Sequence, residues 1–304
     1  MVFNHCLSMA GKNIVFIDID GTLLNTKNRY HVHERDVAAV RVEMRKLARR
    51  GFLFGLNSNR SVSDMLPIYR KFGFNGPLAA ENGLLVKPSA GQKVTALLGR
   101  NDLMTIHKTK LEFQRAVLSY LVDSYKRKVV WLETDTVAAL KRRRGFNYAD
   151  GTLLVLNTKS RVYTTSLYMK IVRRKKLVEA RQMMSELEMH MKALFKDRKD
   201  FTIVTSQFGN MLFYTSAVSK RTAVEWLKEK YGDCDIYAIG DEEGDRGMVD
   251  DLGRFMAVGN ASSALRRRAY ASSKHKYSRG VTDLLRVLEA TTSGCAEQAR
   301  RRAS

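Results

Sequence analysis

Residues 13–20, NIVFIDID, constrain this chain more than any other segment. Apolar residues, most of them β-branched or aromatic, fill its first part, and two carboxylates follow. Such a run is typical of a strand buried on both faces of a parallel sheet. Buried carboxylates are costly unless they have partners, so Asp18 and Asp20 at the end of this strand indicate a functional site. The alternative to a functional site is that the strand simply ends in solvent, where Asp20-Gly21 forms a turn.

The surrounding pattern predicts an α/β fold. The first strand is followed by a helix and two more strands, and after Ser219 a helix that ends at Gly232 precedes another buried strand. Strand–helix–strand order means parallel strands joined by right-handed crossovers. The carboxyl ends of such strands lie at one edge of the sheet, where ligands gather. The expected elements are a helix at 34–50, strands at 52–57 and 77–80, a helix from 219 to 232 and a strand at 236–239.

The middle of the chain has a different pattern and predicts an inserted α+β domain. Two amphipathic helices are expected among several short strands. Together the two patterns predict a Rossmann-like parallel-sheet core, residues 1–85 and 216–290, interrupted by an insertion at 86–215. Residues 291–304 are small, polar and basic and are expected to form a disordered tail. Within the insertion the expected helices are 102–126 and 174–196, and the expected strands are 129–132, 153–156, 162–169, 201–205 and 211–215.

Composition narrows the class of protein. The chain has 304 residues, of which 44% are hydrophobic and 28% charged, as in a folded protein. No apolar run approaches the roughly 20 residues that span a bilayer, so no membrane contact is expected. Cys6, Cys234 and Cys295 are too far apart for a metal motif and are odd in number, so a reducing cytoplasm is the expected location.

The net charge of +22 is large and unevenly distributed. Residues 86–215 contain 25 Lys and Arg against 11 Asp and Glu, a net charge of +14. This excess is compatible with anionic partners, either phosphorylated small molecules or nucleic acid. Solubility alone is the alternative explanation. The basic runs are Lys141–Arg144 and Arg173–Lys176.

Carboxylates at two strand ends suit phosphoryl transfer. Besides Asp18 and Asp20, Gly240-Asp241 and Asp245 follow the strand at 236–239. Magnesium prefers hard oxygen ligands such as these. A carboxylate can attack phosphorus and form an aspartyl-phosphate, and a second carboxylate nearby can exchange the protons. A lysine and a hydroxyl can stabilise the charge that develops on the phosphoryl oxygens.

Five segments resemble the motifs of the haloacid dehalogenase (HAD) superfamily. Asp18-Ile19-Asp20-Gly21-Thr22-Leu23 matches its DxDGT(L) signature, and Ser58-Asn59-Arg60 is similar to its second motif. Ala80-Glu81-Asn82-Gly83 resembles the E-N-G turn of the Cof-like branch, which includes sucrose-phosphate phosphatase. Val218-Ser219-Lys220 and Gly240–Asp245 resemble the third and fourth motifs. The resemblance covers about residues 13–290 and extends to Gly259-Asn260-Ala261.

The resemblance implies a role for each matched residue. Asp18 would be the nucleophile and Asp20 the general acid/base. The phosphoryl group would be bound by Ser58, Asn59, Lys220 and Thr22, and the rest of the substrate by Arg60 and Asn82. Magnesium would be held by Asp18, the Asp20 carbonyl, Asp241 and Asp245. The expected reaction is magnesium-dependent hydrolysis of a small phosphate monoester, expected to be a sugar phosphate.

Two departures from the family pattern concern the substrate more than the reaction. Gly244 replaces the usual Asn of the fourth motif, and Asn57 stands where many relatives have a small or apolar residue. Four polar residues near the motifs have weaker claims to a role, namely His31, His33, Glu242 and Glu243. A phosphomutase of the same superfamily and a nucleic-acid-associated protein on the same scaffold remain as alternatives.

Overall fold

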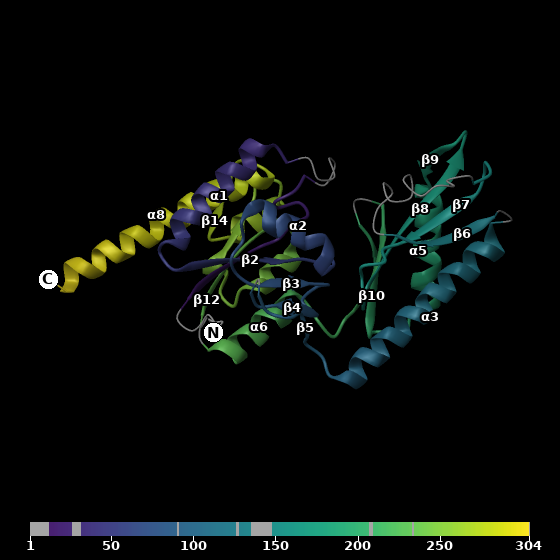
Figure 1. Cartoon of the computed structure of the whole chain (residues 1–304), viewed down its shortest axis with the longest axis horizontal. Helices are drawn as coiled ribbons and strands as arrows, with labels where there is room; N and C mark the ends of the chain where they lie inside the picture. Colours follow the sequence, from purple (N-terminus) through teal and green to yellow (C-terminus); the bar gives the residue numbers. More distant parts are fainter. Residues whose placement is uncertain are drawn as a thin grey trace. The chain divides into compact units, whose positions relative to one another are not determined.

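The computed structural model describes residues 12–25, 32–89, 91–125, 128–134, 148–206, 209–232 and 234–303. Side chains are described within these ranges up to residue 292, except that of Leu252. The chain forms two compact units. The core comprises Met1–Leu97 and Val218–Ser304, and the insertion comprises Leu98–Ala217. Figure 1 shows the core elements in purple, blue, green and yellow and most of the insertion in teal.

An eight-stranded sheet in the order β14-β13-β12-β1-β2-β3-β4-β5 forms the centre of the core. The strands from β14 to β3 are parallel, as expected for an α/β fold. Ile17 of β1 lies opposite Leu56 of β2 and Ile239 of β12, so these three strands end at the same edge. The bounds are β1 Asn13–Ile17, β2 Phe52–Asn57, β3 Leu78–Ala80, β12 Asp235–Gly240, β13 Phe255–Ala257 and β14 Ala271–Ser272.

Two antiparallel strands extend this sheet beyond the boundary expected from the sequence. β4 (Leu85–Lys87) pairs with β3, and β5 (Thr95–Ala96) pairs with β4. The core therefore continues to Leu97 rather than ending at residue 85, and it resumes at Val218 rather than 216. The chain turns back twice and forms these antiparallel pairs before it leaves the sheet. The apolar segments at β4 and β5 are too short to have indicated these two strands.

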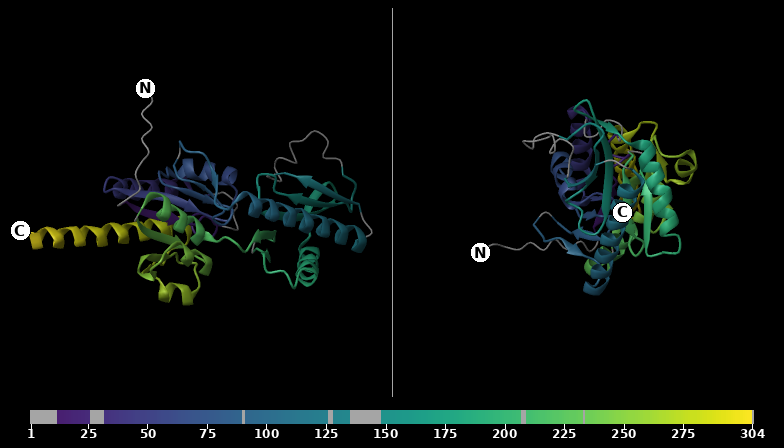
Figure 2. Two further views of the ribbon diagram at one scale, coloured as in Figure 1. Left: turned by 90° about the horizontal axis from the view of Figure 1, so that it is seen from below. Right: turned by 90° about the vertical axis from the view of Figure 1, so that its right-hand side faces the viewer.

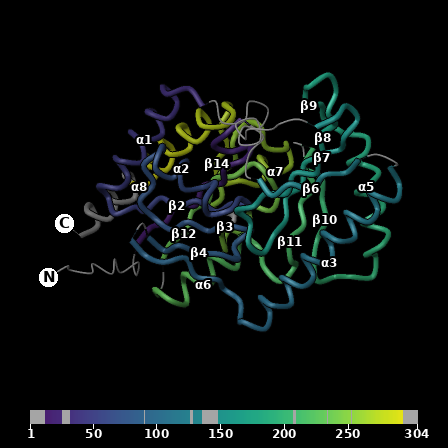
Figure 3. Tube along the Cα trace, turned by 45° about the vertical axis from the view of Figure 1, so that its right-hand side comes forward, coloured from purple at the N-terminus to yellow at the C-terminus, as the bar shows by residue number. Residues whose placement is uncertain are grey.

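Helices cover both faces of the core sheet. α1 (Glu34–Ala48), α2 (Val62–Phe72) and α8 (Tyr277–Ala303) lie together on one face, and α6 (Lys220–Tyr231) lies on the other (Figure 3). α1 packs along α8. The other helical segments in the described part of the core are the short α7 (Ser263–Arg268) and the 3-10 turns η2 (Glu243–Met248) and η3 (Leu252–Arg254).

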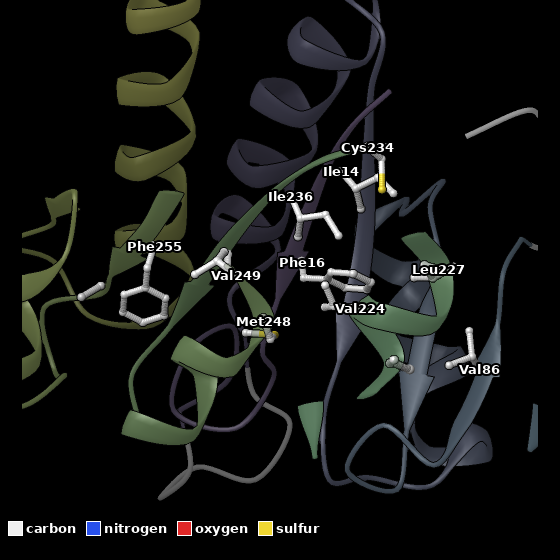
Figure 4. Close-up of a cluster of buried hydrophobic side chains, with 14 of the residues drawn as sticks. Ile14, Phe16, Val86, Val224, Leu227, Cys234, Ile236, Met248, Val249 and Phe255 are labelled. Carbon is white, nitrogen blue, oxygen red and sulfur yellow. The ribbon is translucent and has the colours of Figure 1, made fainter. Parts of the chain in front are cut away.

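Alternation along β1 explains how one strand serves both faces. Ile14 and Phe16 pack with Val224 and Leu227 of α6 in the cluster of Figure 4. Val15 and Ile17 point to the opposite face and are equally inaccessible to solvent. Burial on both sides is the reason for the uninterrupted apolar run in the sequence.

The C-terminal segment differs from its prediction. α8 continues to Ala303 and projects from the core in Figures 1 and 2, whereas residues 291–304 were expected to be a disordered tail. Alanine, glutamate, glutamine and arginine have high helix propensity, and they prolong a helix that packing has already nucleated.

The insertion is built on a mixed sheet in the order β10-β11-β8-β7-β6, with β9 paired to β8. Two helices, α3 (Arg100–Ser124) and α5 (Arg181–Leu194), cover one face. Met184 and Met191 of α5 are buried against this sheet, so these methionines belong to the core of the insertion. The strands are β6 Val129–Glu133, β7 Leu153–Asn157, β8 Thr165–Arg173, β9 Lys176–Glu179, β10 Phe201–Thr205 and β11 Met211–Thr215.

One expected helix begins later than the sequence indicated. Residues 176–179 form β9 and not the first turn of a helix at 174–196. Arg174 and Lys175 have φ of 48° and 58°, and they turn the chain back so that β9 pairs with β8. Leu177 fits a helical spacing and a strand spacing equally well, so periodicity did not distinguish the two. Of the helices that the structure describes, none is long and apolar enough to cross a membrane.

Candidate active site

Three neighbouring parallel strands bring the motif residues together. Asp18 follows β1, Ser58 follows β2 and Asp241 follows β12. The backbone N–H of Asp18 donates to the Ile239 carbonyl at 3.0 Å, and that of Ser58 donates to Ala79 at 3.0 Å. These ladder bonds extend the strands by one residue and fix the backbone from which each functional side chain projects.

An acidic cluster lies at this edge. One carboxylate oxygen from each of Asp18, Asp241 and Asp245 lies within 4.8 Å of the others. Asp18 is 5% exposed and Asp245 1%. Burial, followed by the charge of Asp245, raises the pKa of Asp241 to about 7. Burial also raises the pKa of Asp18 well above its usual range, although Lys220 opposes this effect. Crowded, desolvated carboxylates of this kind favour a bound cation.

Lys220 links two members of this cluster. Its Nζ donates to Asp18 Oδ1 at 2.6 Å and to Asp245 Oδ1 at 2.5 Å. Burial disfavours the ammonium form, but the attraction of the two carboxylates outweighs burial and raises the pKa of Lys220. Lys220 is the first residue of α6, whose N-terminus is capped by Ser219 as the sequence predicted. The lysine is therefore held in its charged form and bonds to two carboxylates of the site.

Asp245 also organises the backbone around the cluster. Its Oδ2 accepts hydrogen bonds from the N–H groups of Asp241 and Glu242, both at 2.9 Å. A Cβ on Gly240 would lie 2.3 Å from Asp245 Cβ, so only glycine fits at the end of β12. With Oδ1 on Lys220 and Oδ2 on the backbone, Asp245 holds the loop that presents Asp241.

Asp20 lies beside the cluster in a bidentate ion pair. Arg60 Nε donates to Asp20 Oδ2 and Nη2 donates to Oδ1, each at 2.7 Å. The side chains are 31% and 14% exposed, so Asp20 is accessible and Arg60 is largely covered. The sequence predicted that Arg60 would contact the substrate. In the structure its guanidinium pairs with the second carboxylate of the first motif, and the contact with substrate stays a prediction.

Comparison with known proteins identifies the family. Residues 15–285 match the family model described as haloacid dehalogenase-like hydrolase. The chain belongs to this family. The match confirms the family that the motifs indicated and the predicted α/β fold. It also confirms the prediction that the protein is an enzyme, and specifically a hydrolase.

Solved structures of other hydrolases share this fold. A haloacid dehalogenase-like hydrolase from Bacteroides thetaiotaomicron superposes with a TM-score of 0.59 at 14% identity, covering 91% of this chain and 99% of that one. The sucrose-phosphatase from Synechocystis, solved with sucrose and phosphate, gives 0.51 at 11% identity, covering 92% and 98%. At these identities the similarity concerns the fold alone.

A sequence relative has a named activity. The phosphoglycolate phosphatase of Sulfolobus acidocaldarius is 37% identical over 73 residues. The match covers 24% of this hydrolase and 30% of that phosphatase. It therefore relates a part of the two chains and not their whole length.

Thr22 of the hydrolase is engaged within the acidic cluster. Its buried hydroxyl donates to Asp241 Oδ1 at 2.9 Å, and its predicted contact with phosphate stays a prediction. Asn260 supports the same carboxylate, because its Nδ2 donates to the Gly21 carbonyl at 2.7 Å and lies 3.4 Å from Asp241 Oδ2. Sequence reasoning noted the Gly-Asn-Ala segment but assigned Asn260 no role.

The loop after β2 contains the other predicted phosphate ligands. Ser58 is 1% exposed, its Oγ accepts a 3.4 Å hydrogen bond from the Arg60 N–H, and Asn59 is half-buried. Asn82, predicted to contact substrate, has φ of 62° and donates through Nδ2 to the Val218 carbonyl at 3.3 Å. Asn82 therefore ties the E-N-G turn to the segment before α6.

Glu242 adjoins the cluster through its backbone N–H, which donates to Asp245 Oδ2, whereas the other weaker candidates lie apart from the cluster or outside the described residues. His33 is exposed and lines a cavity of about 430 Å³ together with Lys274–Arg279, whereas no residue of the acidic cluster lines that cavity. Glu242 and Glu243 are exposed, and Glu243 pairs with Arg246. His31 and Lys141–Arg144 are outside the described residues. Arg173–Lys176 are all exposed at the β8–β9 turn.

Proposed function

We propose that this hydrolase is a magnesium-dependent phosphatase that acts on a small phosphate monoester through an aspartyl-phosphate on Asp18. The observation that carries the proposal is the cluster of Asp18, Asp241 and Asp245, with Lys220 bonded to both Asp18 and Asp245. Buried carboxylates beside a charged lysine match the needs of phosphoryl transfer, which are positioning and charge neutralisation.

In the first step an Asp18 carboxylate oxygen attacks phosphorus and the bond to the substrate's ester oxygen breaks. Asp20 gives its proton to that oxygen, which leaves as an alcohol. Lys220 and the loop of Ser58 and Asn59 stabilise the charge on the phosphoryl oxygens. Thr22 supports this step indirectly, because its hydroxyl orients Asp241.

In the second step water attacks the phosphorus of the aspartyl-phosphate. Asp20 takes the proton from this water, and the bond between phosphorus and the Asp18 oxygen breaks. Inorganic phosphate and the free Asp18 carboxylate result, and Asp20 has recovered the proton that it gave to the alcohol. The partly exposed position of Asp20 beside Arg60 is consistent with a group that meets both alcohol and water.

The donor set fits magnesium. Asp18, the backbone carbonyl of Asp20 and Asp241 would hold the ion, and they are the hard oxygen donors that it prefers. Asp245 would act on the site mainly through Lys220 and the backbone, since both its oxygens have protein partners. Bound magnesium would neutralise the phosphoryl oxygens and favour the ionised form of Asp18.

The substrate is expected to be a small phosphorylated metabolite, with sugar phosphates and 2-phosphoglycolate as the first candidates. The partial match to a phosphoglycolate phosphatase and the shared fold of a sucrose-phosphatase support this choice. A phosphomutase would share the first step. It would return the phosphoryl group to a sugar instead of to water.

The test measures phosphate release by the purified protein from an aryl phosphate, a panel of hexose phosphates and 2-phosphoglycolate, with magnesium and with a chelator. Release is expected only with magnesium, and Asp18→Asn, purified in the same way, is the matched control for contaminating phosphatases. No release from the whole panel with magnesium would refute the proposal. Isomerised hexose phosphate in the product mixture, seen by phosphorus NMR, would favour the mutase.

A further inference from the structure

Asn57 is a polar residue at the end of an otherwise apolar strand. It is the last residue of β2, follows Phe52–Leu56, and is 0% exposed. Its Nδ2 donates to the carbonyl oxygen of Lys220 at 2.8 Å. Its Oδ1 is buried and has no hydrogen-bond partner among the residues that the structure describes. The side chain thus makes one long-range hydrogen bond and leaves one polar atom unsatisfied.

An unsatisfied buried acceptor costs free energy, whereas an apolar side chain of similar volume in the same place would not. Leucine at position 57 would continue the run of apolar residues that β2 buries between its neighbours. Stability therefore does not account for an amide at this position. The hydrogen bond to Lys220 is an alternative explanation for the amide, because Lys220 bonds to two carboxylates of the acidic cluster.

Two further contacts act on the same short segment. Asn82 Nδ2 donates to the Val218 carbonyl, and Gly83 lies so close to Ser219 that an added Cβ would be 2.2 Å from its carbonyl oxygen. Asn82 and Gly83, which follow β3, thus contact Val218 and Ser219. Asn57, the last residue of β2, contacts Lys220. The start of α6 is held at three successive residues, and Asn57 holds the one that carries the ammonium group.

We propose that Asn57 is a positioning residue that fixes the backbone of Lys220 and thereby places its ammonium group against Asp18. The proposal rests on the phosphatase function proposed above. A lysine side chain has four rotatable bonds, so the position of Nζ is only as definite as that of the backbone that carries it. Tying the carbonyl of Lys220 to β2 couples the helix that carries the lysine to the strands that carry Ser58 and Asp18.

The first test compares Asn57→Leu with the wild-type protein. We expect kcat to fall about 10- to 100-fold, the effect of a displacement of about 1 Å at a catalytic group. KM should change less, and the melting temperature should stay the same or rise. A merely structural role would lower the melting temperature and the fraction of active sites, with kcat per active site unchanged. If the leucine variant does not fold, Asn57→Ala, which removes the donor without adding bulk, takes its place.

The second test is a double-mutant cycle with Lys220→Met, read out by kcat and by the dissociation constant of inorganic phosphate. If Asn57 acts through Lys220, Asn57→Leu should have almost no further effect once the ammonium group is gone. Equal losses in the two backgrounds would overturn the proposal. Phosphate binding supplies a result even where the residual kcat of the lysine variant is too low to measure.

Asn157 provides the matched control. It ends β7, is 3% exposed and has a buried Oδ1 for which the described part of the chain offers no partner, but its Nδ2 donates to Glu133. Asn157→Leu should leave kcat within about twofold, because it removes the same kind of group without touching Lys220. Wild-type protein that releases no phosphate would refute the phosphatase function. An active wild type together with Asn57→Leu at wild-type kcat and phosphate affinity would overturn only the role of Asn57.

Discussion

The core and the insertion place their charged side chains in contrasting ways. In the core, a parallel sheet covered on both faces leaves its strand ends as the place for polar groups, and Asp18, Asp241 and Lys220 meet there. In the insertion, Arg173–Lys176 lie exposed at the turn of an antiparallel hairpin. Charges at the sheet edge are desolvated and must be paired, whereas charges on the hairpin are screened by water and salt. The first arrangement suits the phosphoryl chemistry proposed above, whereas the second is expected to attract anions through its electric field.

The largest effect should follow from changing the buried nucleophile. Asp18→Asn should lower turnover by about 10⁴-fold or more, because the amide cannot attack phosphorus. The fold should survive, since an asparagine oxygen can still accept a hydrogen bond from Lys220 and one of three crowded negative charges is gone. Single-turnover assays and circular dichroism would check this. Asp123→Asn, an exposed change in α3 of the insertion, is the control and should retain full activity.

Substantial turnover by Asp18→Asn, once mass spectrometry has excluded deamidation, would show that Asp18 is not the nucleophile. The contrast between the desolvated carboxylates at the edge of the core sheet and the exposed charges of the insertion would then lose its main support.

A pH effect on stability should come next in size. The pKa of Asp241 is raised to about 7 by burial and by Asp245, so metal-free folded protein binds a proton that the unfolded chain has lost. Stability from this group is therefore present at low pH and is lost as pH rises from about 4 to 7. The full loss is at most about 4 kcal/mol for a shift of about three units.

Chemical denaturation with a chelator at several pH values, for wild type and Asp241→Asn, would measure this effect. The difference in unfolding free energy between the two should change in favour of the variant as pH rises, and saturating magnesium should reverse the change. A difference that does not depend on pH would mean that Asp241 is not desolvated as the structure indicates.

The ion pair of Asp20 and Arg60 is intermediate between the two arrangements, because it is only partly exposed. Arg60→Ala should lower kcat about 10- to 100-fold for alkyl phosphates, whose leaving groups need a proton from an oriented acid. Aryl phosphates with good leaving groups should be less affected in the first step, which pre-steady-state release of the phenol would measure. An equal loss for both substrates would assign Arg60 to phosphate binding instead of to orienting Asp20. Arg50→Ala, on the core surface, is the control.

The smallest effect should come from the exposed charge of the insertion. If its field steers anionic substrates, kcat/KM should fall about two- to fivefold as salt rises from about 20 to 200 mM, while kcat changes little. Changing Arg173, Arg174, Lys175 and Lys176 to glutamine should flatten this dependence. Steady-state kinetics at constant free magnesium would test it, and an unchanged salt dependence in the variant would leave these residues without a role in steering.

Much of the fold was predictable from local patterns. The run at 13–17, the helix from Lys220 to Tyr231 and the strand before Asp241 all lie where the sequence placed them. A strand buried on both faces requires uninterrupted apolar residues, and helix ends favour particular capping residues. These elements can therefore be recognised from residues that are close together in the sequence. The motif residues could be named for the same reason, because each follows the end of a recognisable strand or begins a helix.

Local sequence patterns did not predict the structure where two conformations fitted them equally well. Leu177 fits a helix and a strand, and the strained turn at Arg174 and Lys175 decides for β9. The tail at 291–303 has the polar composition of a disordered segment and the helix propensity to continue α8. Packing of the preceding residues of α8 against α1 supplies the nucleus that composition does not reveal.

The sequence by itself determined which residues stand at the strand ends, and hence that carboxylates gather there. Only the tertiary structure decided what each side chain contacts. Thr22 binds Asp241, Arg60 binds Asp20 and Asn57 binds Lys220, across separations of 219, 40 and 163 residues. The identity of a strand end follows from its own neighbours, whereas a hydrogen bond between distant segments depends on how the sheet and helices pack. That packing brings Asn57 and Lys220 within reach of each other, and no local pattern marks them as partners.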